Sequence, residues 1–235
     1  MSEWGPKRFW STVSVEACPE GFSVRLDDRP VRTPAKRALV LPTQAIAGRV
    51  AAEWDAQEEQ VDPATMPWTR SANAAIDKVA TQRREVMDHL AGYAGTDLLS
   101  YRAAGPVELV LWQRETWDPL LDWLASRHGV RFEVTRGVMP VEQDPACVSR
   151  LAQGMESMSS FQLTGFQELV TLSGSFVIAL AVADGAFPVQ DLWSASRLDE
   201  SWQAEQWGED VEAVEESVRK MRAFLHAAEL FRLAG

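Results

Sequence analysis

The sequence predicts an α+β fold, in which a small N-terminal antiparallel β module precedes a larger, mainly α-helical domain. Two observations predict this fold. Short segments with period-two alternation of apolar residues precede Thr43, and stretches with three- and four-residue apolar spacing fill most of the remaining chain. The change occurs across a Pro-containing connector, so we expect domains at residues 1–65 and 66–235.

The β module is predicted from apolar segments that are separated by turn residues. Asp27–Pro30 is one such turn, and Pro19–Gly21 is another. We therefore expect about four short strands that form one or two hairpins. The segments are residues 11–16, 21–26, 31–33 and 38–41.

A helix is predicted to follow the strands. Thr43 is a typical N-cap, and Ile46, Val50 and Trp54 follow at four-residue spacing. We expect Trp54 to be buried where this helix meets the β module. A structural joint then follows, because prolines remove backbone donors and push the preceding residue out of helical geometry. We expect the joint to be non-helical and to form a candidate working region; its residues are Trp54, Asp55, Met66 and Pro67.

Helical periodicity dominates after the joint. Gly129, Gly185 and Gly208 follow three of the helical stretches as C-terminal signals, and Pro119 is expected to split or kink another. A lone strand is expected at residues 131–135. The predicted helices cover residues 69–79, 84–93, 107–128, 161–184 and 188–207, with further helices that begin at 144 and 210.

The composition favours a soluble protein that binds other proteins. The chain has 34 acidic and 23 basic side chains, a formal net charge of −11, and ten Trp against two Tyr. Such acidity disfavours nucleic-acid backbones and anionic membranes and suits partners with basic patches. Most Trp residues serve a protein's own core, but Trp is also enriched where surfaces meet.

Sequence signals for cofactors, metals and targeting are missing. The sequence has no GxxxxGK[ST], GxGxxG or GxSxG pattern, and its three histidines and two cysteines form no metal-ligand spacing. We therefore expect no catalytic residues, no cofactor and no metal. No apolar leader or presequence is visible, and residues 169–182 are too short and polar to span a bilayer, so we expect a cytoplasmic protein.

Acidic residues are concentrated near the C-terminus. This run has no basic residue, and it is either a solvated helix face or part of a binding surface. Its members are Asp199, Glu200, Glu205, Glu209, Asp210, Glu212, Glu215 and Glu216.

Glu200 is predicted to lie on an otherwise apolar helix stripe. At about 100° per residue, Val189, Trp193, Ser196, Ala204 and Trp207 share its face of a helix over residues 188–207. A carboxylate between two indoles needs a cation or a partner, because an unpaired buried charge is costly. The intramolecular cation would be Arg102 or Arg197. Pairing within the chain and binding to a partner both remain open.

An ordered set of segments extends along nearly the whole chain. The segments are Lys7–Trp10, Gly21–Phe22, Leu26–Pro34, Ala52–Gln57, Met66–Pro67, Ala75–Asp77, Thr96–Arg102, Trp117–Leu121, Leu198–Glu200, Gln203 and Glu205–Gly208. Taken in this order, the segments resemble the family of F-type ATP synthase F(1) assembly chaperones that attend the α subunit, in its bacterial form. The specificity of the resemblance comes from the ordered set, and Ser100 departs from the Cys expected there.

The resemblance implies a non-enzymatic chaperone that holds the free α subunit of the synthase and shields its subunit interface during assembly. It also implies the two-part fold predicted above. We expect a monomer when the protein is free. The expected partner-binding residues are Glu200, Asp199, Trp193, Trp207, Gln203, Glu205, Asp97 and Arg102.

Two other functions are weighed beside this one. A small-molecule enzyme could use the carboxylate of Glu200 or Asp97 together with Arg102, and a perturbed acid in a pocket would favour it. A general adaptor with a different protein partner is the third possibility.

Overall fold

The structure, a computed structural model, describes residues 7–137, 139–208 and 210–235. The α+β prediction is confirmed: an N-terminal antiparallel sheet is followed by a mostly helical region. The chain divides into two compact units. Unit 1 holds the described residues up to Arg83 together with Ser159–Gly165 and Glu229–Gly235, and unit 2 holds Arg84–Met158 and Phe166–Ala228. The domain boundary expected between residues 65 and 66 stays a prediction. The first compact unit extends beyond it, to Arg83.

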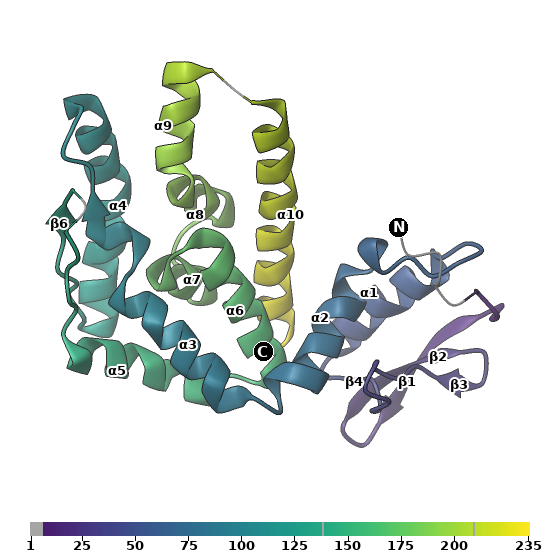
Figure 1. Ribbon diagram of the computed structural model, residues 1–235. Helices are drawn as coiled ribbons and strands as arrows, with labels where there is room; N and C mark the ends of the chain where they lie inside the picture. Colours follow the sequence, from purple (N-terminus) through teal and green to yellow (C-terminus); the bar gives the residue numbers. More distant parts are fainter. Residues whose placement is uncertain (1–6, 138, 209) are drawn as a thin grey trace. The chain divides into compact units, whose positions relative to one another are not determined.

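Unit 1 contains the antiparallel sheet (Figure 1). Its strands are β1 (Val13–Cys18), β2 (Gly21–Leu26), β3 (Arg29–Pro30) and β4 (Val40–Leu41). The first hairpin pairs Val13 with Leu26 and Cys18 with Gly21. Strand β4 pairs with Phe22 and Ser23 near the beginning of β2. Gly21 has φ 147°, and a Cβ there would clash with the Leu41 carbonyl oxygen, so the close approach of β4 to the start of β2 requires glycine. The strand predicted at residues 31–33 is present only as an isolated bridge between Arg32 and Ala38, and β3 lies instead at residues that were predicted to form a turn.

Helix α1 (Gln44–Asp55) packs on this sheet. The Thr43 hydroxyl accepts a hydrogen bond from the Ile46 N–H at 3.3 Å, which confirms the predicted N-cap. Ile46 and Val50 are fully buried in the core of unit 1. Trp54 is only half-buried at the edge of that core, so the expectation of a buried Trp54 is met in part.

The joint is more helical than predicted. Pro63 begins a short 3-10 helix, η1 (Pro63–Thr65), and Pro67 begins α2 (Pro67–Ala74), which continues as a π-helix, η2 (Ala75–Val79). The expectation of a non-helical joint is wrong here, because a proline at the first helical position lacks only a donor that has no partner inside the helix. Asp62 caps η1 by accepting from the Ala64 N–H at 2.9 Å.

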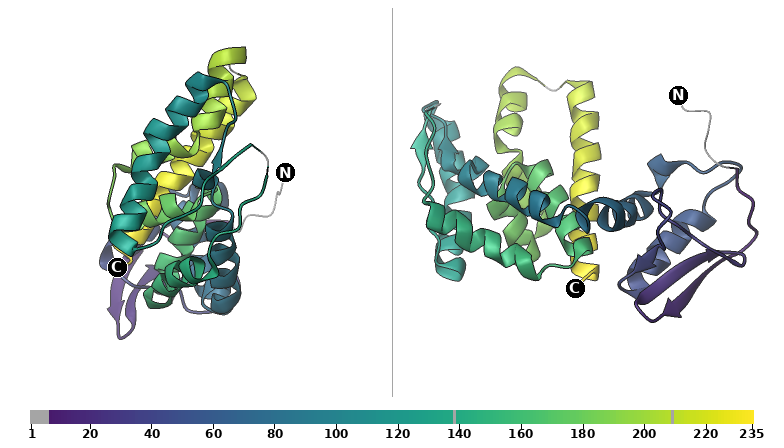
Figure 2. Two further views of the ribbon diagram at one scale, coloured as in Figure 1. Left: turned by 90° about the vertical axis from the view of Figure 1, so that its left-hand side faces the viewer. Right: turned by 60° about the horizontal axis from the view of Figure 1, so that its bottom comes forward.

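Unit 2 is almost entirely helical (Figures 1 and 2). Two β strands of two residues each, β5 and β6, pair in parallel. Two helices, α6 and α10, also contribute residues to unit 1. The elements are α3 (Arg83–Gly95), η3 (Leu98–Ser100), β5 (Tyr101–Arg102), α4 (Val107–His128), β6 (Thr135–Arg136), α5 (Pro145–Gly154), η4 (Met155–Ser157), α6 (Ser160–Ser173), α7 (Phe176–Ala183), α8 (Val189–Ser196), α9 (Leu198–Trp207) and α10 (Val211–Leu233).

Three local predictions in unit 2 need correction. Pro119 does not split α4, which is unbroken from Val107 to His128, and Gly129 with φ of 64° ends it as predicted. The strand expected at residues 131–135 is confined to β6. The helix predicted over residues 188–207 is two helices, α8 and α9, because Arg197 leaves helical geometry at φ −111° and ψ 13°.

Arg197 is held at that break by tertiary contacts. Its Nη2 atom donates to the carbonyl oxygens of Leu172 and Ser173 at 3.3 Å, at the end of α6. The guanidinium also lies over the Trp193 ring at 5.1 Å. These contacts outweigh the helical periodicity of the local sequence.

Among the described residues, no helix is long and apolar enough to cross a membrane. The same part of the chain holds no group of three or more His, Cys, Asp or Glu side chains placed to hold a metal ion.

Candidate functional site

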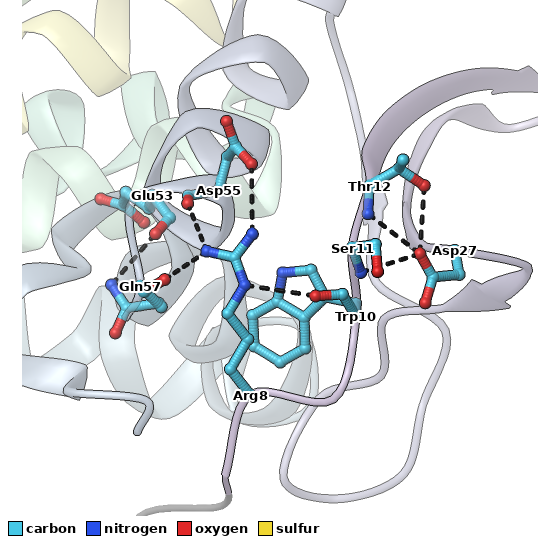
Figure 3. A network of polar contacts seen from close by, with 8 residues as sticks. All are labelled: Arg8, Trp10, Ser11, Thr12, Asp27, Glu53, Asp55 and Gln57. Atoms are coloured by element: carbon cyan, nitrogen blue, oxygen red, sulfur yellow. Dashed lines mark hydrogen bonds and ion pairs between the residues drawn. The ribbon is translucent and has the colours of Figure 1, made fainter. Parts of the chain in front are cut away.

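Arg8 ties the N-terminal segment to the end of α1 (Figure 3). Its Nη1 donates to the Asp55 carbonyl oxygen at 2.8 Å and to the Gln57 carbonyl oxygen, and its Nε donates to the Trp10 carbonyl oxygen at 3.2 Å. The Asp55 carboxylate lies 3.6 Å from Nη2. A cation at a helix C-terminus satisfies carbonyl groups that have no partner within the helix. The Lys7–Trp10 and Ala52–Gln57 segments are therefore parts of one structural clasp.

Glu53 of α1 caps α2, the helix that follows the joint. Its carboxylate accepts from the backbone N–H groups of Trp68 and Thr69 at 2.6 and 2.8 Å, and from the Thr69 hydroxyl at 2.8 Å. Burial raises the pKa of Glu53, while these hydrogen bonds act in the opposite direction. Glu53 supplies the cap because Met66, the residue before α2, has no side-chain cap of its own.

The remaining joint residues also serve the fold. The Gln57 side chain is buried; it donates to the Glu53 carbonyl oxygen and accepts from the Asp62 N–H. Trp54 meets Trp10 edge-on with ring centroids 5.3 Å apart, and Met66 lies in the core. Internal contacts thus hold Trp54, Asp55 and Met66 in the fold, while the buried indole Nε1 of Trp54 has no hydrogen-bond partner among the described residues.

Asp97 is fully buried in unit 2. It caps two elements: its Oδ1 accepts from the Leu99 N–H at 3.0 Å and from the Ser175 hydroxyl at 2.8 Å, and its Oδ2 accepts from the Val177 N–H at 3.0 Å. Burial raises the pKa of Asp97 to about 6, against the effect of these hydrogen bonds. Asp97 therefore links η3 to the N-terminus of α7 and presents no surface to a partner.

Arg102 is a buried cation that is already engaged. Its Nε donates to the Leu99 carbonyl oxygen at 2.9 Å, its Nη1 donates to the Gln113 carbonyl oxygen at 3.1 Å, and its Nη2 lies 3.0 Å from the Asp118 carboxylate. Burial lowers the pKa of Arg102, and the Asp118 carboxylate acts in the opposite direction. Arg102 is therefore paired with Asp118, and the cation beside Glu200 is Arg197.

The predicted stripe around Glu200 does not exist, because α8 and α9 separate its members. Trp193 is buried in α8 against Phe224, with ring centroids 5.4 Å apart, whereas Trp207 at the end of α9 is 79% exposed. The Glu200 side chain is 59% exposed, and its Oε1 lies 2.9 Å from Arg197 Nη1. Glu200 is thus a surface carboxylate with one arginine neighbour.

Helix α9 lies between α4 and α10 in Figure 1. A hollow lies on each side of α9. The first, which we call the α4–α9 hollow, has a volume of about 420 Å³. Gln113 Nε2 donates to Asp199 Oδ1 at 2.7 Å inside it, and Trp202 meets Trp112 edge-on at 6.2 Å. The structure brings four predicted site residues together here: Arg102, Asp199, Gln203 and Trp207.

The second hollow, which we call the α9–α10 groove, has a volume of about 590 Å³. It takes the opposite face of α9, where Glu200 and Glu205 lie, and faces Val214 and Val218 of α10. The two faces arise because residues 199, 202 and 203 fall on one side of a helix and 200, 201 and 204 on the other. Glu209, which belongs to the predicted acidic run, lies outside the described residues.

Sequence reasoning missed several lining residues. Val214 and Val218 have the four-residue spacing that is typical of a buried helix stripe, yet they are 40% and 37% exposed. Gln113 and Trp202 carry no local signal at all, because their role depends on the approach of α4 to α9.

Comparison with known proteins places the chain among chaperones. The model of the ATP12 chaperone protein family matches residues 7–125. The mitochondrial protein atp12 of Schizosaccharomyces pombe is 24% identical over 214 residues, which cover 86% of this chain and 74% of that protein.

Two solved structures resemble the chain along nearly its whole length. Atp12 from Paracoccus denitrificans has a TM-score of 0.93 and 44% identity, and the match covers 97% of this chain and 98% of that one. The Agrobacterium tumefaciens protein Atu1473 also has a TM-score of 0.93, with 38% identity over 98% of this chain and 87% of that one.

Proposed function

The chain belongs to the ATP12 chaperone protein family, which acts in ATP synthase assembly, and we propose that it holds the free α subunit of the catalytic head and shields the surface that a β neighbour later covers. The observation that supports this proposal is the surface of α9. This helix presents an indole at Trp207 and carboxylates at Glu200 and Glu205 to solvent, between two hollows.

Aromatic and acidic groups of this kind suit an unassembled subunit. A subunit that lacks its neighbour exposes apolar surface, and Trp is enriched among the residues that contribute most to protein interfaces. Acids at the rim attract basic patches and set the rate and specificity of the encounter. We assign the direct contacts to Asp199, Glu200, Gln203, Glu205 and Trp207. Trp193, Asp97 and Arg102 support this surface from within unit 2.

We further propose that the chain catalyses no reaction. The alternative, an enzyme that uses Glu200 or Asp97 with Arg102, needs these groups to converge on one substrate. Asp97 is buried as a helix cap, Glu200 is paired with Arg197, and Arg102 is paired with Asp118. We expect no nucleotide hydrolysis, and no ATP binding in the micromolar range by calorimetry.

Binding to separate subunits tests the proposal. The purified chain is mixed with purified α or β subunit of the same synthase, and complexes are measured by size-exclusion chromatography and calorimetry. We expect a complex with α, no complex with β alone, and displacement of the chaperone when β is added to the α complex. Binding to β but not to α, or to neither, would refute the proposal.

A further inference from the structure

We propose that the α9–α10 groove binds an amphipathic α-helix that carries basic side chains, supplied by a protein partner. That this partner is the α subunit rests on the function proposed above. The lining of the groove determines the secondary structure, the charge and the orientation of the segment that the groove accepts.

Helix α10 carries an apolar stripe that is only partly covered. Ala228 is buried on this stripe and Met221 and Leu225 are half-buried, whereas Val211, Val214 and Val218 on the preceding turns are 72%, 40% and 37% exposed. A stripe of this kind normally faces a core along its whole length. No other segment among the described residues covers these exposed turns. The apolar surface of Val211, Val214 and Val218 is therefore free to contact a partner.

Small side chains line both helices of the groove. They are Ser201 and Ala204 on α9 and Ala213 and Ser217 on α10. Small residues at helical spacing let another element approach the helix backbones closely, while the flanking Val214 and Val218 supply apolar walls. The groove is therefore shaped for an elongated insert that lies along the two helices.

The helical walls of the groove exclude an extended insert. Both walls are α-helices, whose backbone donors and acceptors are bonded within the helix, so neither wall offers a strand edge. A segment that enters such a groove must satisfy its own backbone groups, because unpaired polar groups are costly when removed from water. A helix does this and a strand does not.

Charge decides the kind of helix and its orientation. At one end of the groove Glu200 pairs with Arg197 at 2.9 Å, and Glu216 pairs with Lys220 at 3.5 Å and with Arg219. At the other end, Glu205 and Asp210 have no ion pair among the described residues, and Asp210 Oδ1 accepts from the Glu212 N–H at 3.1 Å. Carboxylates without a cation attract basic side chains, so the basic end of the bound helix lies toward Glu205 and Asp210.

A designed peptide tests the groove without any natural partner. The probe is a labelled amphipathic peptide of about 18 residues with Leu on one face and Lys near one end of the other. One twin replaces each Lys by Glu, and a second carries a central Pro that prevents the helix. We expect the Lys peptide to bind by fluorescence anisotropy, and both twins to bind at least about tenfold more weakly.

Matched variants locate the binding site. Ser217→Trp fills the groove and should weaken peptide binding at least about tenfold, while Glu215→Trp, an exposed residue on the opposite face of α10, should change it less than about twofold. Melting temperatures confirm that each variant folds. Ala204→Phe, on the other wall, replaces Ser217→Trp if that variant fails to fold.

The outcomes separate the two proposals. Equal binding of the Lys and Glu peptides, or unchanged binding to Ser217→Trp, would overturn the groove inference. So would a dimer in sedimentation that Ser217→Trp abolishes, because the occupant would then be a second copy of this chain. Peptide binding by a chain that does not bind the α subunit would refute the proposed function and leave the groove inference standing. Capture of the α subunit by Ser217→Trp at full strength would refute the assignment of the α subunit to this groove and leave the proposed function standing.

Discussion

Glu200 Oε1 lies 2.9 Å from Nη1 of Arg197, the residue at which α8 ends and α9 begins. The pair lies at the surface: the Glu200 side chain is 59% exposed. Exposed ion pairs contribute between zero and about 1 kcal/mol to stability. Arg197, by contrast, also donates to the carbonyl groups at the end of α6, and these hydrogen bonds do not depend on the Glu200 carboxylate. Glu200 is therefore available to a partner at little cost to the fold.

Replacing Glu200 should affect binding rather than folding. We expect Glu200→Lys to lower the melting temperature by no more than about 2 °C, because only a surface pair is lost. Its capture of the α subunit should weaken at least about tenfold, because a cation replaces a carboxylate that faces a basic surface. Calorimetry and thermal unfolding on one purified variant measure the two effects.

The control for this experiment is Glu215→Lys, which makes the same charge change on the opposite face of α10. We expect it to bind the α subunit nearly as the parent does. Full binding by a folded Glu200→Lys protein would remove Glu200 from the proposed surface.

Trp54 should matter for stability although it is only half-buried. It packs against the core of unit 1 and against Trp10. Trp54→Arg removes that packing and places a charge beside apolar neighbours, so we expect a loss of roughly 3 kcal/mol in the free energy of unfolding. Trp207→Arg, at an exposed indole, should change it by less than about 0.5 kcal/mol. Urea unfolding of both variants checks the contrast; equal losses would contradict it.

Asp97 should make stability depend on pH. Its pKa is about 6 in the folded chain, against an ordinary value of 3.8, so the folded state holds the proton more tightly than the unfolded state between these values. Stability contributed by this proton grows as pH falls from 7 toward 4. Relative to Asp97→Asn, the wild-type free energy of unfolding should rise by about 1 kcal/mol between pH 7 and pH 5.

Urea titrations at several pH values measure that difference. Asp97→Asn should also be less stable at neutral pH, because its amide nitrogen cannot accept from the backbone N–H groups at the start of α7. A difference between the two proteins that does not change with pH would show that Asp97 stays ionised.

Glu53 should stabilise the joint through its capping of α2. Glu53→Gln keeps one acceptor oxygen but turns an amide nitrogen toward the backbone donors of Trp68 or Thr69, so we expect a loss of about 1–3 kcal/mol. Glu58→Gln, at an exposed position just beyond α1, is the control and should cost little. Chemical unfolding that finds equal stability for the two variants would argue against this capping role.

Local chemistry in the sequence was enough to predict much of the fold. The period-two segments, the Thr43 cap, the Asp144–Pro145 start of α5 and the Gly129 end of α4 depend on near neighbours along the chain, and the structure confirms them. The same kind of reasoning predicted an exposed acidic region around α9. These features are visible in sequence because their physical causes act over a few residues.

The arrangement of the site depended on contacts between distant segments. Periodicity alone placed Trp193, Glu200 and Trp207 on one helix face, but Arg197 bonds to the end of α6, and the resulting break buries Trp193 and leaves Trp207 exposed. Asp97 looked like a surface or catalytic acid until Ser175 and Val177, far along the chain, were placed against it. The α4–α9 hollow and the α9–α10 groove likewise arise only when helices pack side by side, because the energy that positions them comes from tertiary contacts that local sequence does not encode.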